Sequence, residues 1–411
     1  MNKYILSAIS AAAVCMGAAA VTPAKVGKTL PLWSEGYLDI HNVNTARGEC
    51  TFCVLPDGTT MLIDAGEYPS TTPNQAPQRP NAETRSAQAM TDYISHFLPK
   101  GQKSLDYMLV THFHVDHFGW DHEQFPDDPS VPFRPTGVSY IGQRIPVGTI
   151  VDRGYPDYKI LNYLTNTASL DNYCDYVKWS MEKFDTRAER FDVGSNRQFA
   201  LVHRPDAYPT LDIRNIAANG RVWTGVGDVE RNYYLPDDEI PDDEHPGENS
   251  CSTVLRISYG KFDYFNGGDL PSTTRVYWHN IEEPVGMATG AVEAMKCNHH
   301  LNFDTMGEKL LRYLRPQVIV AHTLLAQQPD MGVMRRLFSK HTWPGKRDVF
   351  CTNLHDATKL SAFNTVPKLT DSNGHFVIRV SPGGDEFYVY KLVDTDQSYN
   401  VDAVYGPYEC R

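Results

Sequence analysis

The sequence predicts an α/β sandwich in which two β-sheets meet at a shared edge that carries polar side chains. Each half of the chain contains a predicted β-hairpin that runs into a short turn with glycine and aspartate, Asp64-Ala65-Gly66 in the first half and Gly267-Gly268-Asp269 in the second. Between and after the hairpins, apolar runs of strand length alternate with segments of helical spacing. Two such halves suit a sandwich of two similar sheets, and 411 residues are enough to bury its core.

The first half begins with three strands, continues with a helix and returns to a buried strand. The expected elements are strands over 37–40, 50–55 and 59–63, a helix over 82–98, and a strand over 105–110. The turn Pro56-Asp57-Gly58 joins the two hairpin strands, because these residue types favour tight turns. The helix is predicted because Met90, Ile94 and their apolar neighbours recur at helical spacing up to Pro99, which ends it.

Three histidines and an aspartate directly follow the strand over 105–110, in the segment Thr111-His112-Phe113-His114-Val115-Asp116-His117-Phe118-Gly119. Residues two apart point to the same face of a strand, so His112 and His114 leave the strand end side by side. Asp116 and His117 follow in the turn. Buried imidazoles and carboxylates need partners, and a divalent metal ion satisfies all four at once. The segment is therefore predicted to bind metal.

The rest of the chain alternates between strands and helices, with one long segment of less regular pattern. That segment, about 120–196, contains a strand-like run over 149–152 and a helix around 170–190, and it is predicted to be a lid insertion over the site or a surface insertion with its own packing. Strands are then expected over 199–203, 211–217, 221–224, 253–259, 262–266, 292–296 and 317–321, with a helix over 304–314. Strands over 348–352, 374–380 and 387–392 predict a C-terminal β extension, 346–411, packed on the main body.

Four segments together carry a resemblance to a known family. They are the His-x-His-x-Asp-His motif, Asp64-Ala65-Gly66, Gly267-Gly268-Asp269 and Lys296-Cys297-Asn298-His299-His300. This set resembles the metallo-β-lactamase-fold hydrolases, and its spacings look most like the branch with the hydrolase domain of ComEC-type DNA-uptake proteins and the phosphorylcholine esterases. The resemblance covers roughly residues 38–352 and implies a four-layer αββα fold, a hydrolase domain over 30–345, and a one- or two-metal site.

The family pattern implies metal ligands that are imidazoles and carboxylates of these motifs. The first ion would be held by His112 and His114, the second by Asp116 and His117 with His299 or His300, and both by Asp269. The sequence leaves the choice between His299 and His300 open, with a preference for His299, which is nearer the strand end. A carboxylate at Asp269 suits a bridge between two cations, with one oxygen for each.

Further residues are expected to complete the site. Family members usually place another histidine on the first metal, in the segment before the second hairpin, where this chain has Asn249-Ser250-Cys251-Ser252. Either Asn249 replaces that histidine, or His203 arrives from the preceding strand, or the first metal binds weakly. Asp64 would orient a metal-bound histidine by holding its other ring nitrogen. Lys296 would hold an anionic group of the substrate, or it is a surface lysine.

Imidazole and carboxylate ligands favour zinc, and the expected site holds two ions, although manganese or iron would also suit a carboxylate-rich pair. A water that bridges two cations about 3.5–4 Å apart becomes the nucleophile, a metal-bound hydroxide that Asp116 can orient. The sequence therefore predicts a metal-dependent hydrolase, foremost of phosphodiester or other phosphoester substrates. Hydrolysis of a lactone or β-lactam is the alternative with the same residues. A surface binding protein with a structural metal is an alternative of another class, and its site would be closed by four protein ligands.

Charge and the N-terminal sequence indicate where the protein acts. The net charge of −12 argues against a nucleic-acid partner. Lys3, the apolar stretch that follows it and the small residues Ala18-Ala19-Ala20 predict a cleaved signal peptide over 1–22. No later run in the sequence is long enough to span a bilayer. The protein is expected to be exported to the periplasm or outside the cell, and to act on a small-molecule or cell-envelope substrate.

Overall fold

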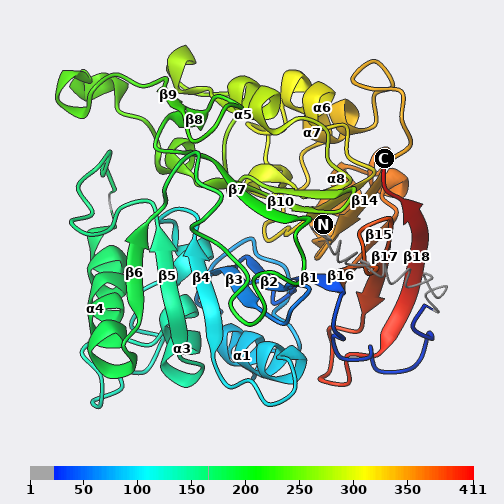
Figure 1. Ribbon diagram of the computed structural model, residues 1–411, viewed down its shortest axis with the longest axis horizontal. Helices are drawn as coiled ribbons and strands as arrows, with labels where there is room; N and C mark the ends of the chain where they lie inside the picture. Colours follow the sequence, from blue (N-terminus) through cyan, green and yellow to red (C-terminus); the bar gives the residue numbers. More distant parts are fainter. Residues whose placement is uncertain (1–22, 165) are drawn as a thin grey trace, which may run out of the picture.

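The computed structural model describes residues 23–164 and 166–411, so the predicted signal peptide, 1–22, lies outside the described residues. Two nine-stranded sheets lie face to face, with helices on the outer face of each (Figure 1). The predicted four-layer αββα sandwich is therefore confirmed. Within the described part of the chain, no helix combines the length and the apolar character needed to cross a membrane.

The first sheet contains strands from both ends of the chain, in the order β18-β17-β16-β1-β2-β3-β4-β5-β6. Its strands are β1 Leu38–Asn42, β2 Cys50–Val54, β3 Thr60–Ala65, β4 Leu105–Val110, β5 Val147–Asp152, β6 Arg187–Arg190, β16 His375–Val380, β17 Glu386–Leu392 and β18 Val401–Glu409. Strand β16 pairs antiparallel with β1, so the C-terminal strands continue this sheet beside its N-terminal strand.

The second sheet has the order β15-β14-β13-β12-β11-β10-β7-β8-β9. Its strands are β7 Leu211–Ala218, β8 Arg221–Trp223, β9 Glu230–Asn232, β10 Val254–Tyr259, β11 Phe262–Asn266, β12 Ala294–Lys296, β13 Val318–Ala321, β14 Asp348–Cys351 and β15 Asp371–Ser372. Strands β14 and β15 extend β13 in parallel, so the C-terminal region contributes to both sheets.

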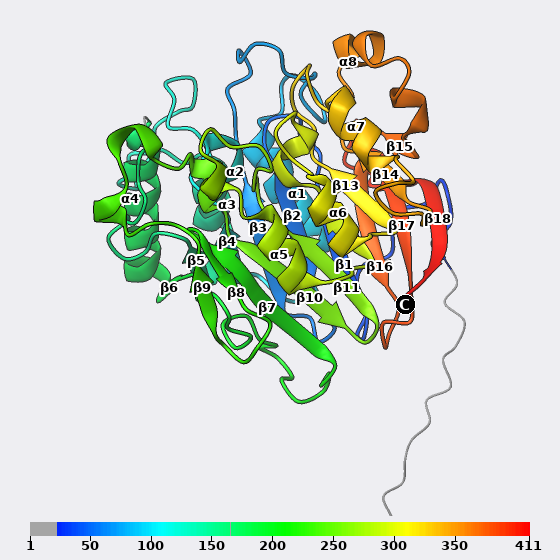
Figure 2. The ribbon, with the colours of Figure 1, turned by 90° about the horizontal axis from the view of Figure 1, so that it is seen from above.

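Helices form the two outer layers, and shorter helices and 3-10 turns lie in the connections between strands. The first sheet is covered by α1 Ser86–Phe97, α3 Gly137–Arg144 and α4 Thr167–Phe184, and the second by α5 Glu282–Thr289, α6 Glu308–Leu314 and α7 Met331–Leu337 (Figure 1). Seen from above, α5 and α6 lie in front of the second sheet (Figure 2). The short helices are α2 Val115–Phe118 and α8 Asp356–Ser361, and the 3-10 turns are η1 Asp237–Glu239, η2 Asp242–Glu244, η3 Glu248–Cys251, η4 Tyr277–His279, η5 Asn298–Leu301 and η6 Val366–Lys368.

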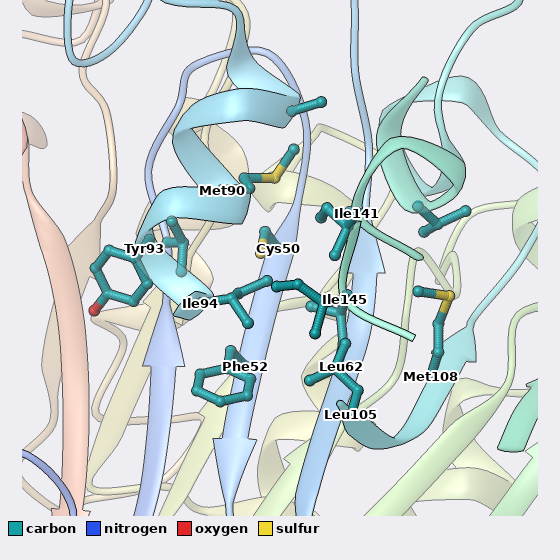
Figure 3. Packing of buried hydrophobic residues seen from close by; sticks show 14 of the residues in the cluster. Cys50, Phe52, Leu62, Met90, Tyr93, Ile94, Leu105, Met108, Ile141 and Ile145 are labelled. Carbon is teal, nitrogen blue, oxygen red and sulfur yellow. The ribbon is translucent and has the colours of Figure 1, made fainter. Parts of the chain in front are cut away.

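Three hydrophobic cores separate the four layers. In the first, Met90 and Ile94 of α1 face Phe52 of β2, as Figure 3 shows. The next residue of β2, Cys53, points the other way into the core between the sheets, because successive strand side chains alternate. The third core lies between the second sheet and α5–α7. Each fully buried side chain of this size contributes about 1.5–3 kcal/mol to the stability of the fold. Apolar residues on both faces of β2 therefore stabilise this strand in the middle of the first sheet.

Parallel pairing brings the strand ends that carry the motifs to one edge of the sandwich. Strands β3 and β4 are parallel, so Asp64 and Thr111 lie at the same end of the first sheet. Strands β11 and β12 are also parallel, so the chain reaches Asp269 and the segment of His300 at one end of the second sheet. The backbone N–H of Thr253 donates to the Thr111 carbonyl at 2.9 Å and joins the two edges. Carboxyl ends of neighbouring parallel strands are the usual place for a site.

The segment 199–203, predicted as a strand, is an irregular loop. Phe199 and Leu201 fill the core between the sheets, whereas Val202 is exposed, and this alternation explains the strand-like pattern. Its backbone bonds to side chains instead of a strand, since Val202 N–H donates to Thr59 Oγ1 at 2.7 Å and His203 N–H donates to Asp57 Oδ2 at 3.0 Å. The segment buries apolar side chains without pairing to a neighbouring strand, and for this reason the prediction of a strand was wrong.

The segment 120–196, predicted to be a lid or a surface insertion, contributes two strands and two helices to the sandwich. The strand-like run over 149–152 is the end of β5, and the helix around 170–190 is α4, which ends before β6 begins. Apart from short connections, the described stretches of this segment without helix or strand are 120–136, 153–164 and the loop after β6. Only these irregular stretches fit the description of an insertion; the rest completes the first sheet and its helical layer.

Candidate metal centre

The metal motif occupies the end of β4 and the single helical turn of α2. His112 and His117 are buried, whereas His114 and Asp116 keep part of their surface exposed, 14% for the Asp116 side chain. Gly119 ends the turn with a φ of 108°, and a Cβ there would lie 2.7 Å from neighbouring backbone, so only glycine fits. The local backbone thus presents the motif at the rim of the sandwich.

Four side chains from both sheets converge beside this rim. His117 Nε2 lies 3.1 Å from Asp269 Oδ2, and His300 Nε2 lies 3.2 Å from the same oxygen. His300 Nε2 also lies 3.3 Å from Asp116 Oδ2. Asp116 and His117 follow β4 of the first sheet, whereas Asp269 and His300 follow β11 and β12 of the second. The four residues Asp116, His117, Asp269 and His300 are called the His300 position below.

Each imidazole of the His300 position is held through its other nitrogen. His117 Nδ1 donates to Asp64 Oδ2 at 2.8 Å, and His300 Nδ1 donates to the carbonyl oxygen of His322 at 2.7 Å. With the tautomers assigned from these bonds, Nε2 of each neutral ring carries the free lone pair. Neither buried Nε2 has a hydrogen-bond partner among the described residues. Two such nitrogens beside a carboxylate fit a divalent cation, which would satisfy both.

Without a cation, the same carboxylates favour protons on these rings. Burial disfavours the charged imidazole, but Asp269 and Asp116 outweigh it and raise the pKa of His300 to about 10. The pKa of His117 is likewise raised well above its ordinary value, against burial, by Asp269 and Asp64. Burial would raise the pKa of Asp269, but the charges of His117 and His300 hold it far below its usual range. Protons and a metal ion therefore compete for the same nitrogens.

Sequence reasoning missed Glu49, which lies beside this cluster. Ligand atoms of Glu49, His117, Asp269 and His300 lie within 4.8 Å of one another, and all four residues are buried. Glu49 nevertheless approaches His300 on its Nδ1 side, at 3.6 Å, and pairs with Lys296 Nζ at 2.8 Å. We therefore assign Glu49 to Lys296, and Asp116, which faces Nε2, to the metal. In the sequence, Glu49 is a single acidic residue before the first hairpin and belongs to no recognised motif, so nothing marked it as a site residue.

Lys296 was predicted to hold an anionic substrate group, and the structure does not leave it free to do so. Its side chain is fully buried, and Nζ donates to the Gly268 carbonyl at 2.6 Å. It also lies 2.8 Å from Glu49 and 3.4 Å from Asp269 Oδ1. A buried ammonium needs such partners, because removing one leaves an uncompensated charge. Lys296 therefore holds one oxygen of Asp269 while the other oxygen faces the imidazoles.

His112 and His114, the predicted ligands of the first ion, form a second pair of imidazoles called the His112 position below. His112 Nε2 lies 3.2 Å from His114 Nδ1 and 3.9 Å from Asp269 Oδ2. On its other side, His112 Nδ1 contacts Thr111 Oγ1 at 3.1 Å. Burial and the neighbouring His117 lower the pKa of His112 well below its ordinary value. Unlike the rings of the His300 position, these two rings satisfy each other.

Of the adjacent residues His299 and His300, His300 contacts the cluster, although the sequence favoured His299. His299 Nδ1 lies 2.7 Å from Asp304 Oδ1, and its Nε2 lies 3.2 Å from Asn249 Nδ2. His299, His300 and Leu301 all have positive φ, between 41° and 58°. This left-handed turn directs the two imidazoles to different neighbours, which strand spacing alone could not predict.

The two candidates for a further ligand of the first ion lie in different places. Asn249 lies in η3 and contacts His299 at the rim. His203 lies 3.3 Å from Asp106, near the start of β4, and its side chain is 41% exposed. The metal motif follows the other end of β4, so the structure does not bring His203 to the cluster. The expectation of a strand over 199–203 had placed His203 too near the site.

Two aromatic side chains stand near the rim. The rings of Tyr68 and Trp120 pack edge to face with their centroids 5.9 Å apart. The negative charge of Asp116, burial and the charge of Asp269 raise the pKa of Tyr68 above its usual range, so its hydroxyl stays protonated. A neutral phenol in this place can donate a hydrogen bond to a bound substrate. No motif marked Tyr68, which opens a proline-rich irregular stretch.

Comparisons with known proteins add little to this geometry. No family model matches the sequence, and no curated protein sequence matches it. Among solved structures, the crystal structure of human tRNase Z, short form, matches 68% of this chain and 91% of its own, with a TM-score of 0.31 and 10% sequence identity. That score is too low to support an argument, so the fold rests on the sheet order and the three cores.

Proposed function

We propose that this protein is a metal-dependent hydrolase that works at the His300 position. One observation supports the proposal above all: two buried imidazole nitrogens face one carboxylate oxygen and have no hydrogen-bond partner within the described chain. Asp116 beside them is partly open to solvent, whereas a structural metal site would be closed by protein ligands. Zinc is the ion we propose, with two ions at full occupancy; manganese or iron would suit the same carboxylate-rich set.

The residues of the site would have separate tasks. A divalent cation bound there would lower the pKa of a coordinated water and offset charge that develops on a substrate oxygen. The Asp116 carboxylate, the least buried member of the set, would accept a hydrogen bond from the attacking water and orient it. Asp64 keeps His117 in its ligating tautomer. The protonated hydroxyl of Tyr68 would donate to the substrate oxygen on which negative charge builds.

The substrate class that we propose is a phosphodiester or related phosphoester. It is supported by the resemblance of four motifs to the phosphorylcholine-esterase and ComEC-like branch. A lactone or β-lactam is the competing class, because its hydrolysis also builds charge on one oxygen. The net charge of −12 argues against nucleic acid, so a small-molecule or cell-envelope substrate is proposed.

Export belongs to the same proposal, and it is supported by the composition of residues 1–22. Expression of the full chain with its native N-terminus, followed by N-terminal sequencing of the periplasmic or secreted protein, tests it. The expected mature chain begins shortly after Ala20. An intact Met1 on protein confined to the cytoplasm would contradict export.

The hydrolase itself is tested by elemental analysis of the purified protein together with a panel of a bis-aryl phosphate, a lactone and a β-lactam. We expect bound zinc and turnover of the phosphodiester. Asp116→Asn and His300→Ala should abolish that turnover. Asp57→Asn is the matched control, because Asp57 is also buried but lies at the far end of the first hairpin. Bound metal without turnover of any substrate would indicate a structural metal site, and turnover that survives both site variants would refute the proposal.

A further inference from the structure

A buried ion pair adjoins the His112 position. Arg153 directly follows β5 and is fully buried, and its Nε donates to Glu248 Oε1 at 2.7 Å while Nη2 donates to Oε2. Glu248 is the first residue of η3 and is 9% exposed. This two-point contact fixes the orientation of the carboxylate as well as its distance.

The same carboxylate holds the backbone of the metal motif. Glu248 Oε1 accepts a hydrogen bond from the N–H of Phe113 at 2.7 Å. Phe113 stands between His112 and His114, so this bond fixes the backbone from which both imidazoles project. The Arg153 guanidinium lies 4.7 Å from the centre of the Phe113 ring, which holds the intervening side chain as well.

Glu248 is also the direct neighbour of Asn249 in η3. Asn249 Oδ1 is buried and has no hydrogen-bond partner in the described parts of the chain. An amide oxygen in that state is available to a cation. One carboxylate is therefore bonded to the His112–His114 segment and covalently joined to the segment with this amide.

Arg153 is in turn fixed by the loop after β5 and by the second sheet. Its Nη1 donates to the Ile160 carbonyl at 3.0 Å and to Asn219 Oδ1 at 3.1 Å, and Asn219 Nδ2 donates to the Arg153 carbonyl at 2.9 Å. Asn219 lies in the turn between β7 and β8. Apolar residues often stabilise a protein as well as a buried ion pair does. Stability alone therefore does not account for this pair, whereas the geometry of the adjoining segments does.

We propose that Arg153 and Glu248 are positioning residues for the His112 position. The ion pair sets the separation between the imidazoles of His112 and His114 and the amide of Asn249, and through it the affinity of that position for a metal ion. Neither Arg153 nor Glu248 touches the ion. The inference rests on the proposed metal centre and adds a separate determinant for one of its two positions.

Cobalt titration of the metal-free full-length protein, followed by visible absorption and elemental analysis, tests this inference. The unaltered protein should bind two equivalents in two phases. Glu248→Gln should keep the first phase and weaken the second by about 10–100-fold, the usual loss when an outer contact of a metal ligand is removed. Glu248→Asp keeps the negative charge but moves the carboxylate away from Arg153 and Phe113, so it should also weaken the second phase. This variant replaces Glu248→Gln in the test if Glu248→Gln fails to fold.

Asp39→Asn is the matched control, because Asp39 forms an equally buried pair with Arg379, at 2.8 Å, at the other end of the first sheet. It should lower the melting temperature to a similar degree and leave both cobalt phases unchanged. Two unchanged phases in the Glu248 variants, or a single phase in the unaltered protein, overturn the positioning role while leaving the hydrolase proposal intact. Absence of any cobalt binding defeats the metal centre itself.

Discussion

The His300 position and the His112 position lie around the same carboxylate, Asp269, yet they differ in how complete they are. At the His300 position, two imidazole nitrogens point at Asp269 and lack other partners among the described residues. At the His112 position, His112 and His114 bond to each other at 3.2 Å. A cation at the His300 position would satisfy two buried nitrogens that lack partners, whereas a cation at the His112 position must first separate two rings. We therefore expect the two positions to fill in a fixed order, the His300 position first.

The largest expected effect comes from removing the residue that the two positions share. Asp269→Ala should abolish tight metal binding at both, because Asp269 Oδ2 lies within 3.9 Å of an imidazole nitrogen of His112, His117 and His300. The loss of affinity should exceed the roughly 10–100-fold typical of outer contacts. Elemental analysis after dialysis measures it, with Asp263→Ala on the neighbouring strand β11 as control. Metal retained at the level of the control would show that Asp269 is not a ligand.

The next largest effect separates the two positions from each other. His300→Ala should remove the tightly bound ion, whereas His114→Ala should remove only the more weakly bound one. Both should lose turnover of the bis-aryl phosphate, because each variant removes a ligand of the proposed centre. Zinc content at graded chelator concentrations distinguishes them. Equal zinc content in the two variants would contradict the proposed order of filling.

The pH dependence gives a smaller but continuous effect. His300 has a pKa of about 10 in the metal-free protein, above its ordinary value of 6.5, so its protonation stabilises that state fully below about pH 6.5 and progressively less up to pH 10. Metal must displace this proton, so apparent metal affinity should rise with pH over the same window. The gain in melting temperature on adding zinc should therefore grow from pH 6.5 to pH 9. A gain that is constant or falls would mean that no proton is displaced from His300.

The smallest expected effect is at His203. Its side chain is 41% exposed and pairs with Asp106, away from the cluster. His203→Ala should leave both cobalt phases unchanged and alter stability by no more than about 0.5 kcal/mol, as is usual for surface substitutions. Asn249→Ala is the informative partner, because it should weaken the second cobalt phase alone. A lost phase in His203→Ala would reverse the assignment between these two residues.

Much of the architecture could be predicted from the sequence, because local patterns decide strands and turns. Both hairpins and the helix over 82–98 occur close to the predicted bounds, where apolar spacing and turn residues agree. The prediction of a strand over 199–203 was wrong, because an irregular loop that places side chains in the core between the sheets has the same apolar pattern as a strand. Within 120–196 the sequence indicated one strand-like run and one helix, and the pairing of β5 with β4 and β6, which continues the first sheet there, depends on contacts between segments.

The sequence could predict a site residue only where the local backbone of its own segment defines which way the side chain points. The sequence identified His112 and Asp116 as candidates because their chemistry and spacing need partners, and it identified Asp269 through the resemblance to a known family. It did not reveal that Lys296 is enclosed between Glu49 and Asp269, because that contact joins three strands. The sequence alone does not distinguish a lysine whose ammonium faces solvent from one whose ammonium faces a buried carboxylate.

The sequence by itself determined the alternating pattern of two sheets and the chemical types gathered at their common edge. Tertiary structure decided which donors face one another: His300 in place of His299, Asp116 on the metal side, and Glu49 on the side of the ammonium. The physical reason is that hydrophobic periodicity and turn chemistry act over a few residues. Coordination depends instead on atoms a few ångströms apart that belong to strands of different sheets, so only the packing of those sheets fixes it.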